Sequence, residues 1–168
     1  MSGNKAEAGT RIDGQALVIT RMFDARRELM WRVWTECRLL KLWWGPKNFT
    51  APHCQIDLRV GGKYLHCMRS PKGRDFWSTG VFLELAPPER LVCTDCFADA
   101  QGNIVPASHY GLGEDWPLET TITVVLAERD GRTHLTLTHG PLPPGKMTEL
   151  TETGWNESFD KMTASLKT

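Results

Sequence analysis

Three side chains with different chemistry alternate along one predicted strand. Tyr64, His66 and Met68 are two positions apart, and side chains at that spacing point to the same face of a strand. A hydroxyl, an imidazole and a thioether on one face fit a small-molecule site, which is mostly apolar with few polar groups. The imidazole has a reference pKa of about 6.5, so His66 is a candidate general base. Packing of the same face against a helix, with no ligand, explains the pattern equally well.

A second candidate for chemistry is the pair Cys93 and Cys96, which has the Cys-x-x-Cys spacing of redox and zinc sites. The pair lies inside a predicted strand, where residues three apart point to opposite faces and lie about 10 Å apart. The two thiols therefore cannot bind one zinc ion or form a disulfide with each other. No second cysteine or histidine pair follows at ligand spacing, so we predict no metal site.

The remaining motifs of common enzymes are absent from the sequence. It has no glycine-rich dinucleotide loop after a strand, no phosphate-binding loop, no His-Glu-x-x-His pair and no Gly-x-Ser-x-Gly elbow. We therefore predict no cofactor. The five cysteines are odd in number and spread along the chain, which favours free thiols in a reducing cytoplasm over a disulfide framework.

Charged residues add weaker candidates. Asp57 and Arg59 are two apart, and they are either an anchor for a substrate carboxylate or, as we favour, an ion pair beside the Gly61-Gly62 turn. Glu84 and Glu119 are candidate inward carboxylates, although strand parity alone does not decide their direction. His139 ends an apolar strand and is expected to be a hydrogen-bonded structural residue.

The overall charge excludes some partners. Lys and Arg number 20, as do Asp and Glu, so the net charge is zero. Nucleic-acid binding needs clustered basic residues, so we predict no nucleic-acid partner. Zero net charge and seven tryptophans are compatible with a homodimer. No apolar run approaches the roughly 18 residues of a membrane span, and the polar start lacks the apolar core of a signal peptide.

The elements that must position these residues follow from periodicity and turn signals. We expect the polar residues 1–14 to be disordered and 15–168 to form one domain. The segment 98–117 is a long loop and therefore functional or mobile. The expected strands are 16–23, 50–59, 63–69, 76–85, 90–97, 118–127 and 133–139, and the expected helices are 25–35, 37–42 and 144–167.

This order predicts an α+β fold in which a strongly curved antiparallel sheet wraps a long C-terminal helix, after two short helices that follow the first strand. A sheet that curls around a helix leaves space wherever the facing side chains do not fill it. That space is a natural ligand cavity.

Several sequence segments, taken in order, carry a family resemblance. They are Phe23-Asp24-Ala25, Trp31, Trp34, Thr35, Trp43-Trp44-Gly45-Pro46, Asp57-Leu58-Arg59-Val60-Gly61-Gly62, Gly80, Glu84, Pro87-Pro88-Glu89-Arg90-Leu91, Leu135-Thr136-Leu137-Thr138-His139 and Gly154-Trp155. The chain resembles the START-like (SRPBCC, Bet v 1-like) superfamily, and within it the homologues of the activator of heat-shock protein 90 ATPase. The resemblance implies a helix-grip fold with an internal apolar cavity. Arg38 stands where the family usually has proline.

Three functions follow from the resemblance and the candidate residues. The first is binding of a hydrophobic or amphipathic small molecule, such as a lipid or polyketide. The second is a protein-binding module that modulates a heat-shock protein 90-type chaperone ATPase. The third is a cyclase or hydrolase on a hydrophobic substrate, which needs two converging polar groups and is less favoured than binding. The candidate cavity-lining residues are Trp43, Trp44, Tyr64, His66, Met68, Phe82, Trp155, Phe159 and Met162. For Trp43 and Trp44 the alternative, which we favour, is a structural plug that closes the helix onto the sheet. Trp155, Phe159 and Met162 are core residues first, and they line a cavity only if the facing sheet leaves room.

Overall fold

The computed structural model describes residues 8–167. In order along the chain, the strands are β1 (Ala8–Asp13), β2 (Ala16–Phe23), β3 (Thr50–Ile56), β4 (Lys63–Arg69), β5 (Asp75–Ala86), β6 (Arg90–Ala98), β7 (Thr120–Arg129) and β8 (Arg132–Gly140). The helices are α1 (Arg27–Thr35), α2 (Cys37–Leu40), the short 3-10 helix η1 (Ala107–Tyr110) and α3 (Lys146–Ser165).

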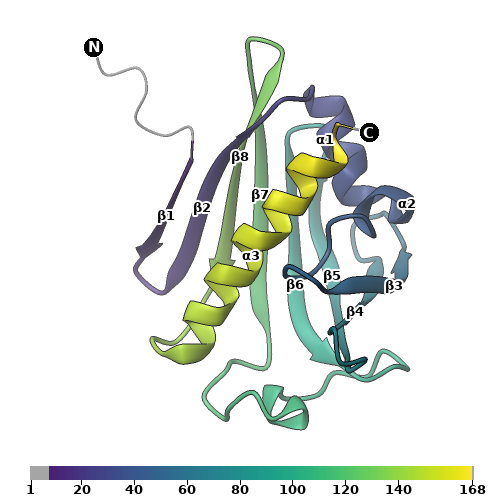
Figure 1. Cartoon of the computed structure of the whole chain (residues 1–168), viewed down its shortest axis with the longest axis vertical. Coiled ribbons are helices and arrows are strands. Elements are labelled where there is room, and N and C mark those ends of the chain that lie inside the picture. The colour runs from purple at the N-terminus through teal and green to yellow at the C-terminus, as the bar shows by residue number, and fades with distance from the viewer. Residues whose placement is uncertain (1–7, 168) are drawn as a thin grey trace.

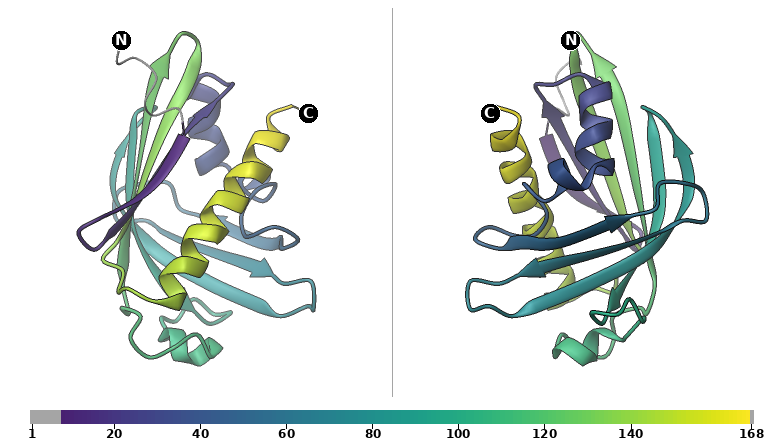
Figure 2. Two further views of the ribbon diagram at one scale, coloured as in Figure 1. Left: turned by 60° about the vertical axis from the view of Figure 1, so that its left-hand side comes forward. Right: turned by 90° about the vertical axis from the view of Figure 1, so that its right-hand side faces the viewer.

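One antiparallel sheet contains all of these strands, in the order β1-β2-β8-β7-β6-β5-β4-β3. The sheet is strongly curled, and α3 crosses its concave side diagonally (Figures 1 and 2). α1 and α2 close one end of the concave side, while the loop that carries η1 lies at the opposite end (Figure 1). The predicted α+β helix-grip fold is therefore confirmed.

Side-chain alternation explains how the sheet supports a core. On β7 every second residue from Thr120 to Leu126 is buried, and the residues between them are half-buried. On β4 the predicted shared face of Tyr64, His66 and Met68 is the inner one, because Tyr64 joins the core and His66 packs against Trp44. The strand alternation thus directs apolar residues toward α3, as the period of two requires.

The first strand corrects one prediction. We expected residues 1–14 to be disordered, but residues 8–13 form β1, which pairs with β2 from Ala8 opposite Arg21 to Asp13 opposite Ala16. The turn between the two strands uses Gly14 at a φ of 63°, a conformation that glycine adopts easily. As an edge strand exposed from Gly9 to Asp13, β1 has no buried face and so no apolar alternation to reveal it. The remainder of the predicted disordered tail, residues 1–7, lies outside the described residues.

The cysteines correct a second prediction. Cys37 at the start of α2 and Cys54 on β3 form a disulfide with a Cα–Cα distance of 5.5 Å, so the prediction of five free thiols is wrong for these two. Cys67, Cys93 and Cys96 are free and buried. The disulfide closes the segment that contains Trp43 and Trp44. It also removes one argument for a reducing compartment, and the cytoplasmic location stays a prediction.

An aromatic cluster forms the centre of the core. Trp43 is fully buried, its Nε1 donates to the Val33 carbonyl oxygen at 3.0 Å, and its ring packs 4.6 Å from that of Trp34. Phe23 and Phe159 meet edge to face across the sheet and α3. Within residues 8–167, no helix is both long enough and apolar enough to cross a membrane.

Candidate functional site

A cavity of about 410 Å³ lies between the N-terminal half of α3 and the inner face of β4, β5 and β6. The segment 44–49 closes one side, and residues Leu112 and Trp116 of the η1 loop close another. The lining residues are Trp44, Gly45, Pro46, Phe49, Met68, Phe76, Ser78, Asp95, Phe97, Leu112, Trp116, His139, Met147, Leu150, Thr151, Thr153, Gly154, Trp155, Glu157 and Ser158.

The apolar stripe of α3 divides between core and cavity. In its C-terminal half, Phe159 and Met162 are fully buried in the core. In its N-terminal half, Met147, Leu150 and Trp155 line the cavity. One helix face therefore builds both the core and the cavity wall.

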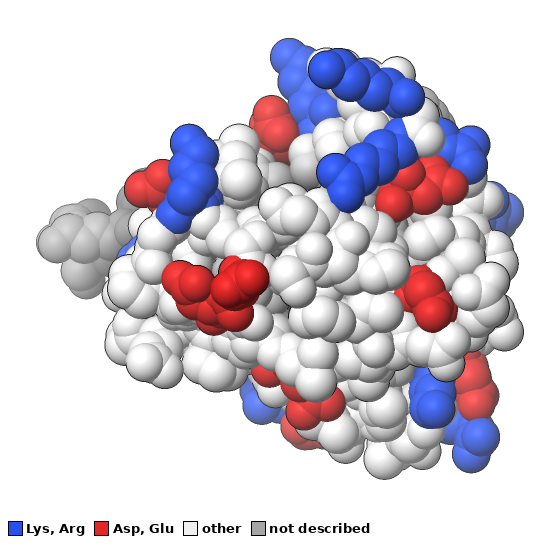
Figure 3. Space-filling view, turned by 90° about the horizontal axis from the view of Figure 1, so that it is seen from below, with Lys and Arg blue, Asp and Glu red and all other residues white. Residues whose placement is uncertain are grey.

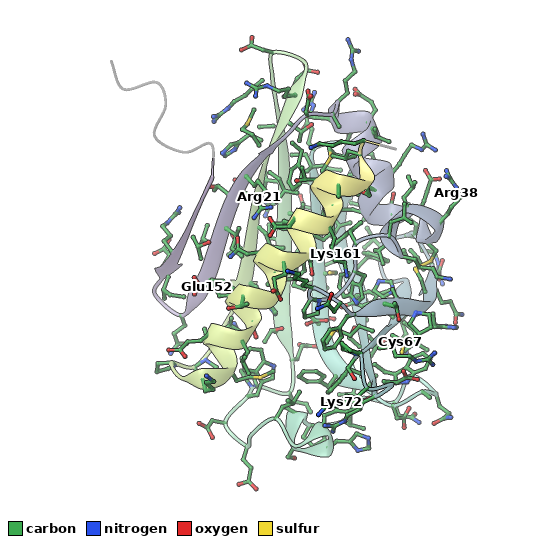
Figure 4. The ribbon with its side chains drawn as sticks, in the orientation of Figure 1. Arg21, Arg38, Cys67, Lys72, Glu152 and Lys161 are labelled. Carbon is green, nitrogen blue, oxygen red and sulfur yellow. A yellow bond between two sulfur atoms is a disulfide. The ribbon has the colours of Figure 1, made fainter. Side chains whose placement is uncertain are left out.

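The segment 44–49 is fastened to α3 by polar contacts. The Lys161 Nζ atom donates to the carbonyl oxygens of Gly45, Pro46 and Phe49 at 2.9–3.1 Å, with the Trp44 oxygen at 3.4 Å. Lys161 lies on the side of the helix away from Arg21 (Figure 4). Burial lowers the pKa of its ammonium. These contacts hold one cavity wall at a fixed distance from the helix.

We expect Lys161→Met to destabilise the protein by about 2 kcal/mol, because the variant keeps the aliphatic stem and loses several charged hydrogen bonds. Urea unfolding at pH 7.5 measures this loss. The matched control is Lys41→Met, because Lys41 is exposed and its removal is expected to change stability by less than about 0.5 kcal/mol. Equal stabilities of the two variants would contradict the role assigned to Lys161.

Asp95 is the polar centre of the cavity floor. It sits on the inner face of β6, and 23% of its side chain is accessible. Its Oδ1 atom lies 2.8 Å from the Tyr64 hydroxyl, which also lies 2.9 Å from the Thr94 carbonyl oxygen. The anionic carboxylate is the stronger acceptor of the single hydroxyl proton. Burial raises the pKa of Asp95 to about 6, against the opposing effect of the Tyr64 hydrogen bond.

His139 is fixed beside Asp95 by a chain of hydrogen bonds. An indole N–H only donates, so Trp155 Nε1 donates to His139 Nδ1 at 3.1 Å. The neutral imidazole then carries its proton on Nε2 and donates it to Thr120 Oγ1 at 2.9 Å. Thr120 in turn donates to the Asp95 carbonyl oxygen at 3.2 Å. Burial lowers the pKa of His139 to about 4, so this chain holds a neutral, oriented ring.

His66 is inward but does not reach the cavity. Its ring stacks on Tyr64 at 4.7 Å and lies 4.9 Å from Trp44, and its Nδ1 atom is buried without a hydrogen-bond partner in the described structure. Burial lowers its pKa to about 3. The predicted general base is therefore a neutral core residue in this geometry.

The predicted lining residues separate into two groups. Trp44, Met68 and Trp155 line the cavity, whereas Trp43, Tyr64, His66, Phe82, Phe159 and Met162 are buried and outside its lining. Adjacent tryptophans cannot share one orientation, and here Trp43 enters the core while Trp44 faces the cavity. Tyr64 still acts on the site through its hydroxyl. Ligand binding by these residues stays a prediction.

The other charged candidates lie elsewhere. Glu84 and Glu119 are both exposed, and Glu84 accepts a hydrogen bond from Arg90. The predicted Asp57–Arg59 ion pair is present at 2.8 Å on the surface. In the adjacent turn, Gly61 has a φ of 85°, whereas Gly62 is required because a Cβ atom there would lie 2.1 Å from the Asp57 oxygen.

Asp95 is the functional candidate that sequence reasoning missed. On β6, Leu91 and Cys93 join the core and Asp95 and Phe97 line the cavity, so one carboxylate interrupts an apolar series of inner positions. A buried charge is costly unless it has partners, and this interruption was the available signal. Cys93 and Cys96, whose spacing is the more familiar motif, lie on either side of it in the sequence. Those thiols are buried and on opposite faces, and no group of three or more His, Cys, Asp or Glu side chains within residues 8–167 is placed to hold a metal ion.

Comparison with known proteins places this geometry in a family. The family model described as "Activator of Hsp90 ATPase homolog 1-like protein" matches residues 24–167. The chain belongs to this family. Membership agrees with the resemblance drawn from the sequence segments, and it covers both the cavity and the core. No curated protein matches the sequence significantly.

Solved structures of similar proteins share the fold. A protein from Arthrobacter aurescens is 28% identical with a TM-score of 0.78, and the match covers 95% of this chain and 91% of that one. A protein from Nitrosomonas europaea is 27% identical with a TM-score of 0.73, over 93% and 97% of the two chains. A protein from Mycobacterium smegmatis, at 23% identity and a TM-score of 0.74 over 95% and 93%, supports the fold alone.

Proposed function

We propose that this protein binds a hydrophobic or amphipathic small molecule in the cavity between α3 and the sheet. The observation that carries the proposal is the cavity itself, whose volume of about 410 Å³ falls in the range of small-molecule sites, roughly 300–1,000 Å³. Its lining is mostly apolar, with the Asp95 carboxylate as a fixed polar group. This is the composition expected of a site that encloses an apolar body and orients it through one contact.

The test is binding of the neutral fluorescent probe N-phenyl-1-naphthylamine. We expect saturable fluorescence enhancement with one probe per chain. Ser78→Phe, which adds a ring on the inner face of β5 between His66 and Phe97, should weaken binding at least about tenfold by filling the cavity. Native mass spectrometry of the purified protein tests in parallel for a bound apolar molecule.

The control for the blocking variant is Thr123→Phe, which adds the same ring to the outer face of β7. Thr123 alternates with the buried Ile122 and Val124, so the new ring points away from the cavity. Both variants must retain the parent circular dichroism spectrum. Equal binding by Ser78→Phe and the parent, or loss of binding in Thr123→Phe alone, would overturn the proposal.

An acid–base enzyme is less well supported than a binding protein. Asp95 has a raised pKa inside an apolar site, which is typical of a catalytic acid or base. A second free proton-transfer group beside Asp95 is needed as well, and both nitrogens of its neighbour His139 are engaged by Trp155 and Thr120. The alternative function is modulation of a chaperone ATPase, which the family description suggests. A homodimer stays a prediction about the oligomeric state.

A further inference from the structure

One oxygen of the Asp95 carboxylate faces the cavity without a donor from the described residues. Oδ1 accepts a hydrogen bond from the Tyr64 hydroxyl. The Nε2 atom of His139 lies 3.7 Å from Oδ2, which is too far for a hydrogen bond. The His139 proton is already directed to Thr120. Oδ2 is therefore an open acceptor in a mostly apolar wall.

Among the described residues, no basic side chain in the cavity lining balances this carboxylate. Of the lining residues in the described chain, Asp95 and Glu157 are acidic and none is Lys or Arg. Two nearby basic side chains bind backbone groups. Lys161 donates to the carbonyl oxygens of the segment 44–49, and Arg74 donates to the backbone carbonyl oxygen of Tyr110 at 2.6 Å. Lys146 borders a smaller adjoining pocket at the start of α3.

Aromatic rings strengthen the same electrostatic preference. Six rings line the cavity, from Trp44, Phe49, Phe76, Phe97, Trp116 and Trp155. The face of an aromatic ring carries partial negative charge and attracts a cation placed over it. The cavity lining therefore combines the carboxylates of Asp95 and Glu157 with the partial negative charges of the ring faces.

The chain around Asp95 and the η1 loop is acidic as well. Between Arg90 and Arg129 there is no Lys or Arg, while five acidic residues occur from β6 to the start of β7: Asp95, Asp99, Glu114, Asp115 and Glu119. Figure 3 views the end of the molecule where the η1 loop lies. The middle of that face is mostly uncharged, and Lys and Arg side chains lie toward its margins. This segment therefore has no Lys or Arg side chain that would repel an approaching cation.

We propose that the ligand is an apolar, ring-containing amine in its protonated form, and that the Asp95 carboxylate binds its ammonium group. The inference rests on the proposed function, because it names the class of molecule that the cavity holds. Oδ2 accepts the ammonium proton, the aromatic rings surround the apolar body, and Tyr64 fixes the carboxylate through Oδ1. An anionic ligand, such as a fatty acid, would bring a second negative charge to Asp95 with no cation to offset it.

The test compares three molecules of nearly equal shape at pH 7.5: 1-naphthylmethylamine, 1-naphthalenemethanol and 1-naphthoate. Isothermal titration calorimetry should give the tightest binding for the amine, weaker binding for the neutral alcohol and the weakest for the carboxylate. We expect the amine and the carboxylate to differ by at least about tenfold in Kd. Asp95→Asn should weaken the amine about tenfold and leave the alcohol nearly unchanged.

Two further variants separate contact from general charge. Glu157→Gln removes the acidic group at the cavity wall, and Glu128→Gln removes an exposed charge near the end of β7; each is expected to change amine binding less than Asp95→Asn does. If the alcohol and the amine bind equally, or Asp95→Asn leaves amine binding unchanged, the inference is wrong while the proposed binding function stands. If none of the three binds and the neutral probe also fails, both are wrong.

Discussion

When the pH falls from 7.5 to 4, we expect the free energy of unfolding of the His66→Phe variant to decrease by about 3 kcal/mol less than that of the parent chain. Burial lowers the pKa of His66 from 6.5 to about 3, so the folded protein holds this ring neutral where the unfolded chain protonates it. The stability that the neutral His66 ring contributes to the folded protein is fully present above pH 6.5 and is lost as the pH falls toward 3. A phenyl ring keeps the contacts with Tyr64 and Trp44 and has no proton to take up.

The measurement is the free energy of unfolding in urea at several pH values between 4 and 7.5. The shape of the curve is the readout, because a small packing penalty from the larger ring shifts all points equally. Part of the acid sensitivity should remain in the variant, since burial also lowers the pKa of His139 to about 4. Met68→Leu, at the next inward position of β4, should leave the shape of the curve unchanged. If the free energy of unfolding of His66→Phe changed with pH in parallel with that of the parent, His66 would not titrate as its burial requires.

The fold was predictable where a periodic pattern has a buried face. Alternation on β4 places Tyr64, His66 and Met68 inward, and the helical stripe identifies α3, because in both cases burial selects the residue type. β1 has no buried face and so left no pattern. The Cys37–Cys54 disulfide joins a short helix to a strand, and their separation in the chain says nothing about their distance in space.

The site was predictable only in part because core and cavity use the same residues. Phe159 and Trp155 belong to one stripe of α3, yet one is fully buried and the other faces open space. Which of the two occurs depends on the volume of the side chains opposite, and small residues such as Ser78 and Gly154 leave room that periodicity does not record. The polar group of the site, Asp95, was missed, although a carboxylate among inward apolar residues is a signal for function, because burying an ionised group without a partner is unfavourable.

That cost gives the last prediction: Asp95→Asn should stabilise the protein by up to about 3 kcal/mol at pH 7.5. Burial raises the pKa of Asp95 from 3.8 to about 6, so ionisation is harder in the folded state. The free energy of unfolding of the parent therefore falls, relative to that of the variant, as the pH rises from about 4 to about 6, and the full difference is reached above that range. The amide side chain of the variant would keep an oxygen for the Tyr64 hydroxyl and carry no charge.

The stabilities of parent and variant should therefore converge as the pH approaches 4, and urea unfolding across this range measures the convergence. Asp99→Asn provides a control of opposite sign, because backbone and side-chain hydrogen bonds from Asn103 lower the pKa of Asp99 and its loss should destabilise at pH 7.5. A gain in stability together with a loss of amine binding in Asp95→Asn would identify Asp95 as a group kept for binding at the expense of stability. A variant that is less stable than the parent at pH 7.5 would instead make Asp95 a structural residue of the Tyr64 network.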